Sequence, residues 1–348
     1  MVPGRRLLVT GASGFVGSAL AARLVSEGAQ VVGLSREVRE SDDPGIEWIV
    51  GDLEDRDAMD RATRDVDGVF HVGGMVGHYG GRAKYLRANV LGTRHVILAC
   101  RRNGVRTLVF TSTPSVIADG TPHFGVNETH PYSRRFQSPY SESKALAEQE
   151  VRAANGPDLR TVCIRPHMIW GPGRSHWVGG FRKLAARGRL FQAGDGTNRV
   201  GMTYMDDCID AHLLALLAAE CDAAVGGQAF FVHGGIPVLL WQWVSQLVEA
   251  LGLEPIKFEV PRAAMTTVAT VFDALVSLSG GKLHFPVSRY LVTELTTDHY
   301  SDISRARSCL GYEPRVSVEE GIERLARISS SSFDSSAMAS ISRLPISR

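Results

Sequence analysis

The sequence predicts an α/β fold, a doubly wound and mostly parallel sheet with a smaller C-terminal lobe. Short apolar runs alternate with helical patterns through the first half of the chain, as in βαβ units. A glycine-rich turn joins the first apolar run to the first helical pattern. Polar motifs follow these runs where parallel strands would end, which is the edge where such sheets bind ligands.

Composition narrows the class of protein before any motif is considered. The chain has 348 residues and is 44% hydrophobic, which indicates a globular protein. Its net charge of +1 and its lack of an arginine-rich stripe argue against a nucleic-acid partner. Five scattered cysteines without CxxC spacing suit a reducing compartment. With no apolar run of about 18 residues and no room for a signal peptide before the first strand, we expect a soluble cytoplasmic protein without a spanning segment.

The stretch "RRLLVTGASGFVGSALAARLVSEGAQVVGLS" predicts the first βαβ unit, with strands over 7–10 and 31–34. Gly11 permits the tight turn, and Gly14 lets the backbone approach a pyrophosphate at the helix N-terminus. Gly17 allows close packing of helix on strand. A strand before the glycine-rich turn, and a helix and a second strand after it, are the surroundings expected of a Rossmann-type dinucleotide site.

The end of the second strand usually distinguishes the two nicotinamide cofactors. An acidic residue there binds the ribose 2′-hydroxyl of NAD and repels the 2′-phosphate of NADP. This chain has Ser35 and Arg36, which offer no carboxylate and one guanidinium able to pair with phosphate. We therefore predict NADP(H) over NAD(H), although Arg36 also fits a solvated loop charge.

The alternation continues along the chain. Further strands are predicted over 46–50, 68–72, 105–111 and 160–165, and helices over 54–64, 83–103 and 139–155. The motifs "GDL", "HVGG", "TSTPS" and "PHMIWGPG" each follow one of these strands.

The stretch "YSESK" places Tyr140 and Lys144 four residues apart on a predicted helix, so both side chains can reach one point. A free phenol has a pKa near ~10 and is a poor acid or base at neutral pH. A nearby ammonium favours the phenolate and would lower that pKa. Five letters alone also fit a surface helix, so the interpretation depends on the surrounding motifs.

Those motifs, taken in order, resemble the motif series of extended short-chain dehydrogenases/reductases. The quoted matches are "TGASGFVG", "GDL", "HVGG", "NVLGT", "TSTPSV", "YSESK" and "RPHMIWGPG". Residues 293–325 resemble the C-terminal region of the 3β-hydroxysteroid dehydrogenase/isomerase-like branch, in which reductases of 2-alkyl-3-keto acids are most similar and sterol dehydrogenases close behind. The resemblance implies hydride transfer between NAD(P) and a ketone or secondary alcohol on a bulky apolar substrate, and a homodimer.

The resemblance also assigns roles to individual residues. Tyr140 would exchange a proton with the substrate oxygen, Lys144 would lower the phenol pKa and bind the nicotinamide ribose, and Thr113 would orient the substrate oxygen. A slip of one or two positions would move that last role to Thr111, Ser112 or Ser115. The family uses the amide of the residue at Asn89 for local structure. The cofactor contacts implied are Gly11, Ser13, Gly14, Phe15, Val16, Gly17, Ser35, Arg36, Asp52, Leu53, Val72, Gly73, Gly74, Asn89, Tyr140, Lys144, Pro166, Met168 and Ile169.

Two other functions stay open. The sugar-modifying members usually carry "VYG" after the catalytic hydroxyl residue, whereas this chain has Val116, Ile117 and Ala118. This departure weakens a nucleotide-sugar epimerase or dehydratase without removing it. A non-catalytic protein that senses NADP and regulates a partner is the alternative of another class, and the intact pair of Tyr140 and Lys144 argues against it.

The C-terminal half predicts a substrate-binding lobe with helices over 177–187, 207–220, 238–252 and 262–279. An apolar stripe on the last of these favours core packing, with a lipid pocket wall or peripheral membrane contact as alternatives. Candidate substrate contacts are His78, Ser115, Arg174, His176, Arg199 and Tyr204. Arg174 and Arg199 also suit a substrate carboxylate.

Domain organisation and metal binding complete the expectations. We expect a dinucleotide-binding domain over 1–170, to which later strands can return, and a substrate lobe over 171–328. Residues 329–348 are Ser-rich and are predicted to be disordered. Eleven histidines show no metal-ligand spacing, so we expect no metal.

Overall fold

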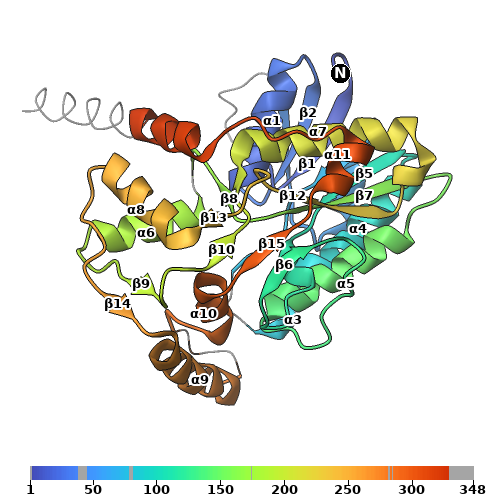
Figure 1. Ribbon diagram of the computed structural model, residues 1–348. Helices are drawn as coiled ribbons and strands as arrows, with labels where there is room; N and C mark the ends of the chain where they lie inside the picture. Colours follow the sequence, from blue (N-terminus) through green and yellow to red (C-terminus); the bar gives the residue numbers. More distant parts are fainter. Residues whose placement is uncertain are drawn as a thin grey trace, which may run out of the picture.

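The computed structural model describes residues 2–37, 45–77, 81–173, 175–280, 283 and 285–328. Its centre is a seven-stranded sheet in the order β12-β7-β5-β4-β1-β2-β3, and all six pairings are parallel (Figure 1). The strands are β1 (Arg6–Thr10), β2 (Gln30–Ser35), β3 (Ile46–Val50), β4 (Gly68–His71), β5 (Thr107–Thr111), β7 (Arg160–Pro166) and β12 (Gln228–Val232). The predicted α/β fold is confirmed.

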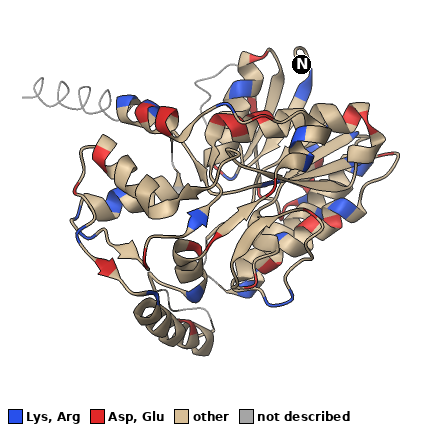
Figure 2. Cartoon of the chain, in the orientation of Figure 1, with Lys and Arg blue, Asp and Glu red and all other residues tan. Residues whose placement is uncertain are grey.

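Helices cover both faces of this sheet, which explains why its central strands read as continuous apolar runs. On one face, α1 (Phe15–Ser26) and α7 (Met205–Cys221) pack over β1, β5 and β7, with α11 (Ser304–Leu310) beside them. On the other face lie α2 (Arg56–Ala62), α4 (Gly92–Arg102) and α5 (Pro139–Ala153), and α4 is preceded by α3 (Arg82–Tyr85) and a π-helical turn, η1 (Leu86–Leu91). Acidic and basic residues are interspersed along these helices (Figure 2).

The second half of the chain does not form a separate block. After α6 (His176–Ala185), helix α7 and strand β12 return to the large sheet, where β12 pairs with β7. Conversely, β6 (His123–Val126) leaves the first half and pairs with β15 (His299–Ser301). A second sheet in the order β13-β10-β15-β6 results, in which β10 is Arg199–Val200 and β13 is Val238–Leu239. Two lobes are therefore joined by several chain crossings.

The smaller lobe has a core of its own, built around Trp170, Trp243 and Phe181. The Trp170 ring meets the Trp243 ring edge-on, with centroids 5.2 Å apart. The remaining elements of this lobe are β8 (Ile169–Trp170), β9 (Gln192–Ala193), β11 (Thr203–Tyr204), α8 (Leu240–Ala250), β14 (Glu259–Val260), α9 (Arg262–Leu278) and α10 (Arg289–Thr296). A further helix spans 318–328.

Helix α9 corrects one expectation. Core packing was favoured for its apolar stripe, yet Val268, Val271 and Leu278 are 47%, 54% and 86% exposed. Only Met265 and Ala269 of this helix are buried. The reason is that α9 lies at the edge of the small lobe, against α10 (Figure 1), so most of its surface faces solvent.

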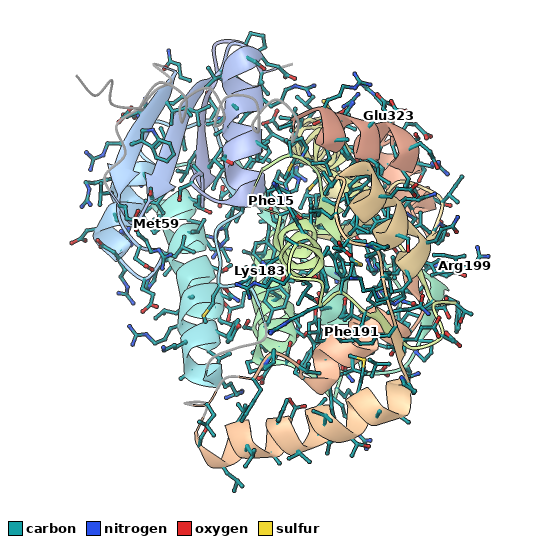
Figure 3. All side chains as sticks on the ribbon, turned by 90° about the vertical axis from the view of Figure 1, so that its left-hand side faces the viewer. Phe15, Met59, Lys183, Phe191, Arg199 and Glu323 are labelled. Atoms are coloured by element: carbon teal, nitrogen blue, oxygen red, sulfur yellow. The ribbon has the colours of Figure 1, made fainter. Side chains whose placement is uncertain are left out.

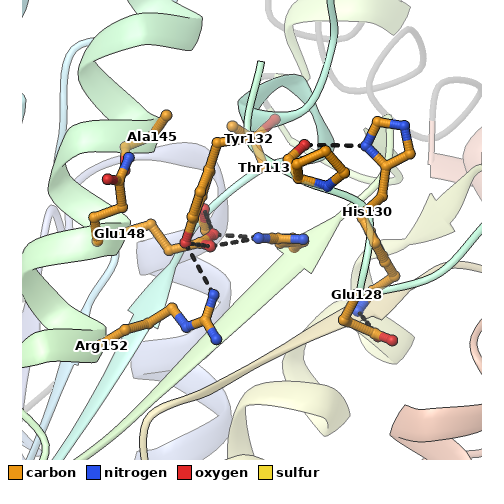
Figure 4. A network of polar contacts seen from close by, with 12 residues as sticks. Thr113, Glu128, His130, Tyr132, Ala145, Glu148 and Arg152 are labelled. Atoms are coloured by element: carbon orange, nitrogen blue, oxygen red, sulfur yellow. Dashed lines mark hydrogen bonds and ion pairs between the residues drawn. The ribbon is translucent and has the colours of Figure 1, made fainter. Parts of the chain in front are cut away.

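A buried ion pair attaches α5 to the large sheet. Glu148 on α5 accepts hydrogen bonds from Arg165 on β7, at 3.0 Å from Nε and 2.6 Å from Nη2. It also accepts from the Ser112 hydroxyl and, at 2.7 Å, from the Tyr132 hydroxyl, which in turn accepts from Arg152 (Figure 4). Arg165 and Glu148 are 1% and 0% exposed. Their charges are thus separated from water and depend on each other.

We expect Arg165→Leu to lower the free energy of unfolding by about 3–5 kcal/mol, because it leaves the Glu148 carboxylate buried without its partner. The matched control is Arg94→Leu, which removes an ion pair to Glu150 on the same helix whose two side chains are 58% and 26% exposed. That loss should stay below about 1 kcal/mol. Urea unfolding measures both, and equal losses would contradict a special role for the buried pair.

Candidate active site

One continuous cleft of about 1040 Å³ runs along the carboxyl ends of the large sheet's strands. At one end it is lined by the glycine turn after β1, and at the other by residues of α10 and β15. Most of the predicted cofactor positions line it: Gly11, Ser13, Gly14, Phe15, Val16, Gly17, Ser35, Arg36, Asp52, Leu53, Val72, Gly73, Gly74, Tyr140, Lys144, Pro166, Met168 and Ile169. Residues spread over 160 positions of sequence thus meet at one edge of the sheet.

The turn after β1 requires glycine at two positions, because the backbone packs closely there. Gly11 has φ +67°, and a Cβ there would lie 2.7 Å from the Cα of Gly73. A Cβ on Gly17 would lie 2.1 Å from the carbonyl oxygen of Gly11, so only glycine lets α1 approach β1 this closely. Helix α1 begins after Gly14 without a side-chain cap and without an acidic residue in its first turn. Its first N–H groups point at the cleft end and fit the pyrophosphate of a nicotinamide dinucleotide.

The end of β2 forms the adenosine side of the cleft. Ser35 is buried, whereas the Arg36 side chain is exposed and lines the cleft. Across from them, Asp52 accepts a hydrogen bond from the Glu54 backbone N–H at 3.1 Å, which fixes the turn after β3. A guanidinium therefore stands at the position where a 2′-phosphate is distinguished from a hydroxyl.

Asn89 corrects one site assignment, because it lies behind the cleft instead of lining it. Its Oδ1 accepts from the Met75 backbone N–H at 2.6 Å, and its Nδ2 donates to the Met75 carbonyl at 3.0 Å. The same amide donates to the Ser143 hydroxyl at 2.9 Å. Asn89 thus ties the loop after β4 to helix α5 and positions Gly73 and Gly74 without contacting the cavity.

Helix α5 positions the tyrosine and lysine. Ser138 caps its N-terminus by accepting from the Ser141 backbone N–H at 3.1 Å, and proline follows at the first helical position. Lys144 is buried, with Nζ donating to the Thr111 carbonyl at 2.6 Å and lying 3.9 Å from the centroid of the Phe110 ring. Burial lowers the pKa of Lys144 to about 7, against the opposing attraction of Glu148.

Burial determines the pKa of Tyr140. It raises this pKa to about 12, while the nearby Thr113 hydroxyl opposes the shift and the Glu294 charge adds to it. The effect of Lys144 on this pKa stays a prediction, and its Nζ donates to the Thr111 carbonyl. In this structure the phenol is a strongly held proton donor, and its phenolate form is disfavoured.

Four hydroxyls were candidates for orienting the substrate oxygen, and two of them are engaged in the interior. Thr111 lies 2.7 Å from His212 Nε2, and Ser112 donates to Glu148. Thr113 instead caps a 3₁₀ turn, η2 (Pro114–Val116), and its Oγ1 lies 2.7 Å from the Ser115 Oγ. Thr113 lines the cleft together with Tyr140, and its hydroxyl is close enough to lower the pKa of that phenol.

The predicted substrate contacts divide into two groups. Ser115 lines the cleft as expected. Tyr204 does not, because it is 2% exposed and packs edge-on against the Trp170 ring inside the small lobe. Arg199 also lies away from the cleft, on exposed β10 at the outer edge of the molecule (Figure 3), where the strand pairing turns it to solvent. His78, Arg174 and the side chain of His176 lie outside the described residues.

The sequence interpretation missed the far wall of the cleft. Tyr290 and Glu294 stand one turn apart on α10 and both line the cavity. Burial raises the pKa of both groups, and Glu294 forms no ion pair among the described residues. His123 and His299 line the same end, from the paired strands β6 and β15. A tyrosine and a carboxylate at i, i+4 spacing in "RYLVTEL" was the available signal.

The described residues provide neither a metal site nor a membrane-spanning helix. No group of three or more His, Cys, Asp or Glu side chains among them is arranged to hold a metal ion. No helix in that part of the chain has both the length and the apolar content needed to cross a bilayer.

Comparison with known sequences identifies relatives along almost the whole chain. The model of the "3-beta hydroxysteroid dehydrogenase/isomerase family" matches residues 8–262. A 2-alkyl-3-oxoalkanoate reductase of Stenotrophomonas maltophilia is 40% identical over 92% of this chain and 98% of its own. A decarboxylating sterol-4-alpha-carboxylate 3-dehydrogenase of Mus musculus is 30% identical over 92% of this chain and 90% of its own.

Comparison with solved structures gives the same fold. MoeE5, solved in complex with UDP-glucuronic acid and NAD, is 25% identical with a TM-score of 0.73, over 94% of this chain and 99% of its own. An epimerase from Methanothermobacter thermautotrophicus has a TM-score of 0.75 at 22% identity, over 95% of this chain and 94% of its own.

Proposed function

The chain belongs to the 3-beta hydroxysteroid dehydrogenase/isomerase family and is an NAD(P)-dependent oxidoreductase of ketones and secondary alcohols, and we propose that Tyr140 is its general acid and base. The observation that carries this proposal is the position of Tyr140. It lines the same cavity as Thr113, Lys144 and the glycine turn that fits a dinucleotide.

A bound nicotinamide dinucleotide supplies or accepts the hydride. During reduction, Tyr140 donates its proton to the carbonyl oxygen, and in the reverse direction it takes the proton from the alcohol. Thr113 holds the reacting oxygens in line, and Lys144, fixed by the Thr111 carbonyl, faces the cleft where the family's lysine binds the nicotinamide ribose. Proton and hydride thus reach opposite ends of one C–O bond.

We propose a bulky apolar ketone as substrate, of the 2-alkyl-3-keto acid or 3β-hydroxysteroid type. The relatives' names support both substrate types. The cleft supports the apolar character, since much of the wall around Tyr140 is hydrocarbon or aromatic: Met75, Val76, Ile117, Val126, Trp177, Phe231, Tyr290, Leu291 and Tyr300.

The two alternatives fit less well. A nucleotide-sugar epimerase has the fold in its favour, yet Ile117 and Ala118 line the cleft at the "VYG" position, so the polar contacts of that motif are missing there. A ligand that binds the folded protein raises its melting temperature, so comparing UDP-sugars, steroids and keto acids in this assay distinguishes these substrate classes. A purely regulatory NADP sensor would not need Tyr140, Thr113 and Lys144 together in the cleft.

We expect Tyr140→Phe to lower kcat for ketone reduction by about 10²–10⁴-fold, because the variant has no proton to donate. NADPH binding should stay within about twofold of the wild type, since the glycine turn and α1 hold the pyrophosphate. The rate of NADPH oxidation with a 2-alkyl-3-keto acid and with a 3-ketosteroid measures the turnover. Wild-type turnover in the variant would refute the role of Tyr140.

We propose NADP(H) as the preferred cofactor on the basis of Arg36. Arg36→Ala should raise KM for NADPH about tenfold or more, as expected for the loss of a charge-assisted hydrogen bond to phosphate, and leave KM for NADH within about twofold. Lys84→Ala is the matched control, because Lys84 is another exposed cation on the cleft rim. If Arg36→Ala changed both cofactors equally, or the wild type preferred NADH, the proposal would be wrong.

We further propose a cytoplasmic homodimer that touches membranes through α9. The dimer rests on the family resemblance, and the membrane contact on the exposed apolar side chains Val268, Val271, Leu275 and Leu278. Sedimentation equilibrium should give twice the 37.7 kDa chain mass.

The membrane contact is tested separately. Wild-type protein should co-sediment with anionic lipid vesicles, and the double variant Val271→Ser/Leu278→Ser should not. Monomers, or equal co-sedimentation, would contradict the respective proposal.

A further inference from the structure

We propose that Tyr85 is a positioning residue, which holds one wall of the cleft at a fixed distance from the Tyr140 phenol. This wall is the loop that follows β4, residues 73–77, here called the wall loop. Tyr85 is 0% exposed and is not among the described residues that line the cleft. The proposal rests on the role proposed for Tyr140, and it gives a task to a residue for which the motif series implies none.

The wall loop is held at two neighbouring points by one segment of the chain. Asn89 in η1 binds the N–H and the carbonyl group of Met75, at 2.6 and 3.0 Å. Tyr85 at the end of α3 donates from its hydroxyl to the Gly77 carbonyl at 2.8 Å. Tyr85 and Asn89 are four residues apart, so they lie on the same side of this segment. Val76 is therefore carried between two fixed residues.

The held residues form part of the substrate wall. Met75, Val76 and Gly77 all line the cleft. Val76 is 69% exposed, so packing in the interior does not hold it in place. Without the bond from Tyr85, Asn89 would be the only side-chain anchor left for residues 75–77 among the described residues. The substrate would then have to order the loop as it binds, which costs binding free energy.

The same segment also supports the proposed catalytic tyrosine. The Tyr85 ring meets the Tyr140 ring edge-on, with centroids 6.5 Å apart and planes at 65°. The Asn89 amide donates to the Ser143 hydroxyl at 2.9 Å, and this hydroxyl donates to the Tyr140 carbonyl at 2.9 Å. The wall loop and Tyr140 thus share one support, at the junction of α3 and η1.

A shared support fixes the position of the substrate relative to its proton donor. A ketone that rests against the wall loop presents its oxygen to the Tyr140 hydroxyl only if the loop and the ring keep their separation. A misplacement of about 1 Å can lower a rate about 10²-fold. The hydroxyl of Tyr85 acts on the wall and its ring acts on the phenol, so two substitutions separate the two contributions.

The test begins with Tyr85→Phe, which removes the hydroxyl and keeps the ring. We expect KM for the ketone to rise about three- to tenfold, as for the loss of one hydrogen bond, and kcat to stay within about twofold. KM for NADPH should also stay within about twofold, because the glycine turn is untouched. Steady-state NADPH oxidation with a 2-alkyl-3-keto acid, and in parallel with a 3-ketosteroid, measures these constants.

Tyr312→Phe is the matched control. Tyr312 is also 0% exposed, and its hydroxyl also donates to a backbone carbonyl, that of His233, at 3.1 Å. It is not among the described residues that line the cleft. Both variants should lose a similar amount of Tm, whereas only Tyr85→Phe should change KM. A merely structural role would lower Tm and the amount of active enzyme and would leave KM unchanged.

Tyr85→Leu removes the ring as well as the hydroxyl. We expect kcat to fall about tenfold or more in addition to the rise in KM, because Tyr140 loses the ring that orients it. The conservative Tyr85→Phe should restore kcat but not KM. If neither variant folds, as judged by a missing thermal transition, Val76→Gly loosens the same loop at an exposed position. It should raise KM for the ketone by a similar factor.

Three results would overturn the proposal: a wild-type KM for the ketone in Tyr85→Phe or, where that variant does not fold, in Val76→Gly; an equal rise in KM in Tyr312→Phe; or a wild-type kcat in Tyr85→Leu. These outcomes are distinct from failure of the proposed function. An inactive Tyr140→Phe together with an unchanged Tyr85→Phe refutes the positioning role alone, whereas wild-type turnover in Tyr140→Phe refutes both.

Discussion

The buried pair of Glu148 and Arg165 is the interaction on which the site geometry depends. It fixes the register of α5 against β7, and through the Ser112 hydroxyl it also holds the end of β5. Tyr140 and Lys144 lie two turns and one turn before Glu148 on that helix. Their heights above the strand ends therefore follow from a contact in the interior. Burying the charges of Glu148 and Arg165 costs free energy of desolvation, and their mutual contacts hold α5 rigidly in place.

Burial sets the chemistry as well as the geometry. It moves the pKa of Tyr140 up, which keeps the phenol protonated, and that of Lys144 down to about 7, near neutral pH. A neutral phenol donates hydrogen bonds well but loses its proton only with difficulty. Its use in catalysis therefore depends on the groups around it. Such neighbours surround Tyr140 here, from η2 on one side and from α10 on the other.

The sequence predicted the large sheet and the cofactor half of the site because their signals are local. Apolar runs, the glycine turn and the Tyr140 to Lys144 spacing each lie within a few residues of one another, and the predicted helices agree with the structure within a few positions. The substrate half could not be predicted in this way. Strand β6 pairs with β15 across more than 170 positions, and no local pattern indicates which wall α10 completes. Arg199 and Tyr204 were misjudged for the same reason, since their exposure and burial are set by the tertiary packing of the small lobe.

The exchange of β6 and β12 between the two halves of the chain has a consequence for the evolution of this fold. A substrate lobe encoded by one contiguous stretch can be traded between genes as a cassette, whereas here the lobe is interleaved with the cofactor domain at several crossings. Recombination at a single breakpoint between them would pair β15 with a β6 from another parent, or β7 with such a β12. Point substitution along the cleft walls leaves these pairings intact and is therefore the less disruptive route to a new specificity.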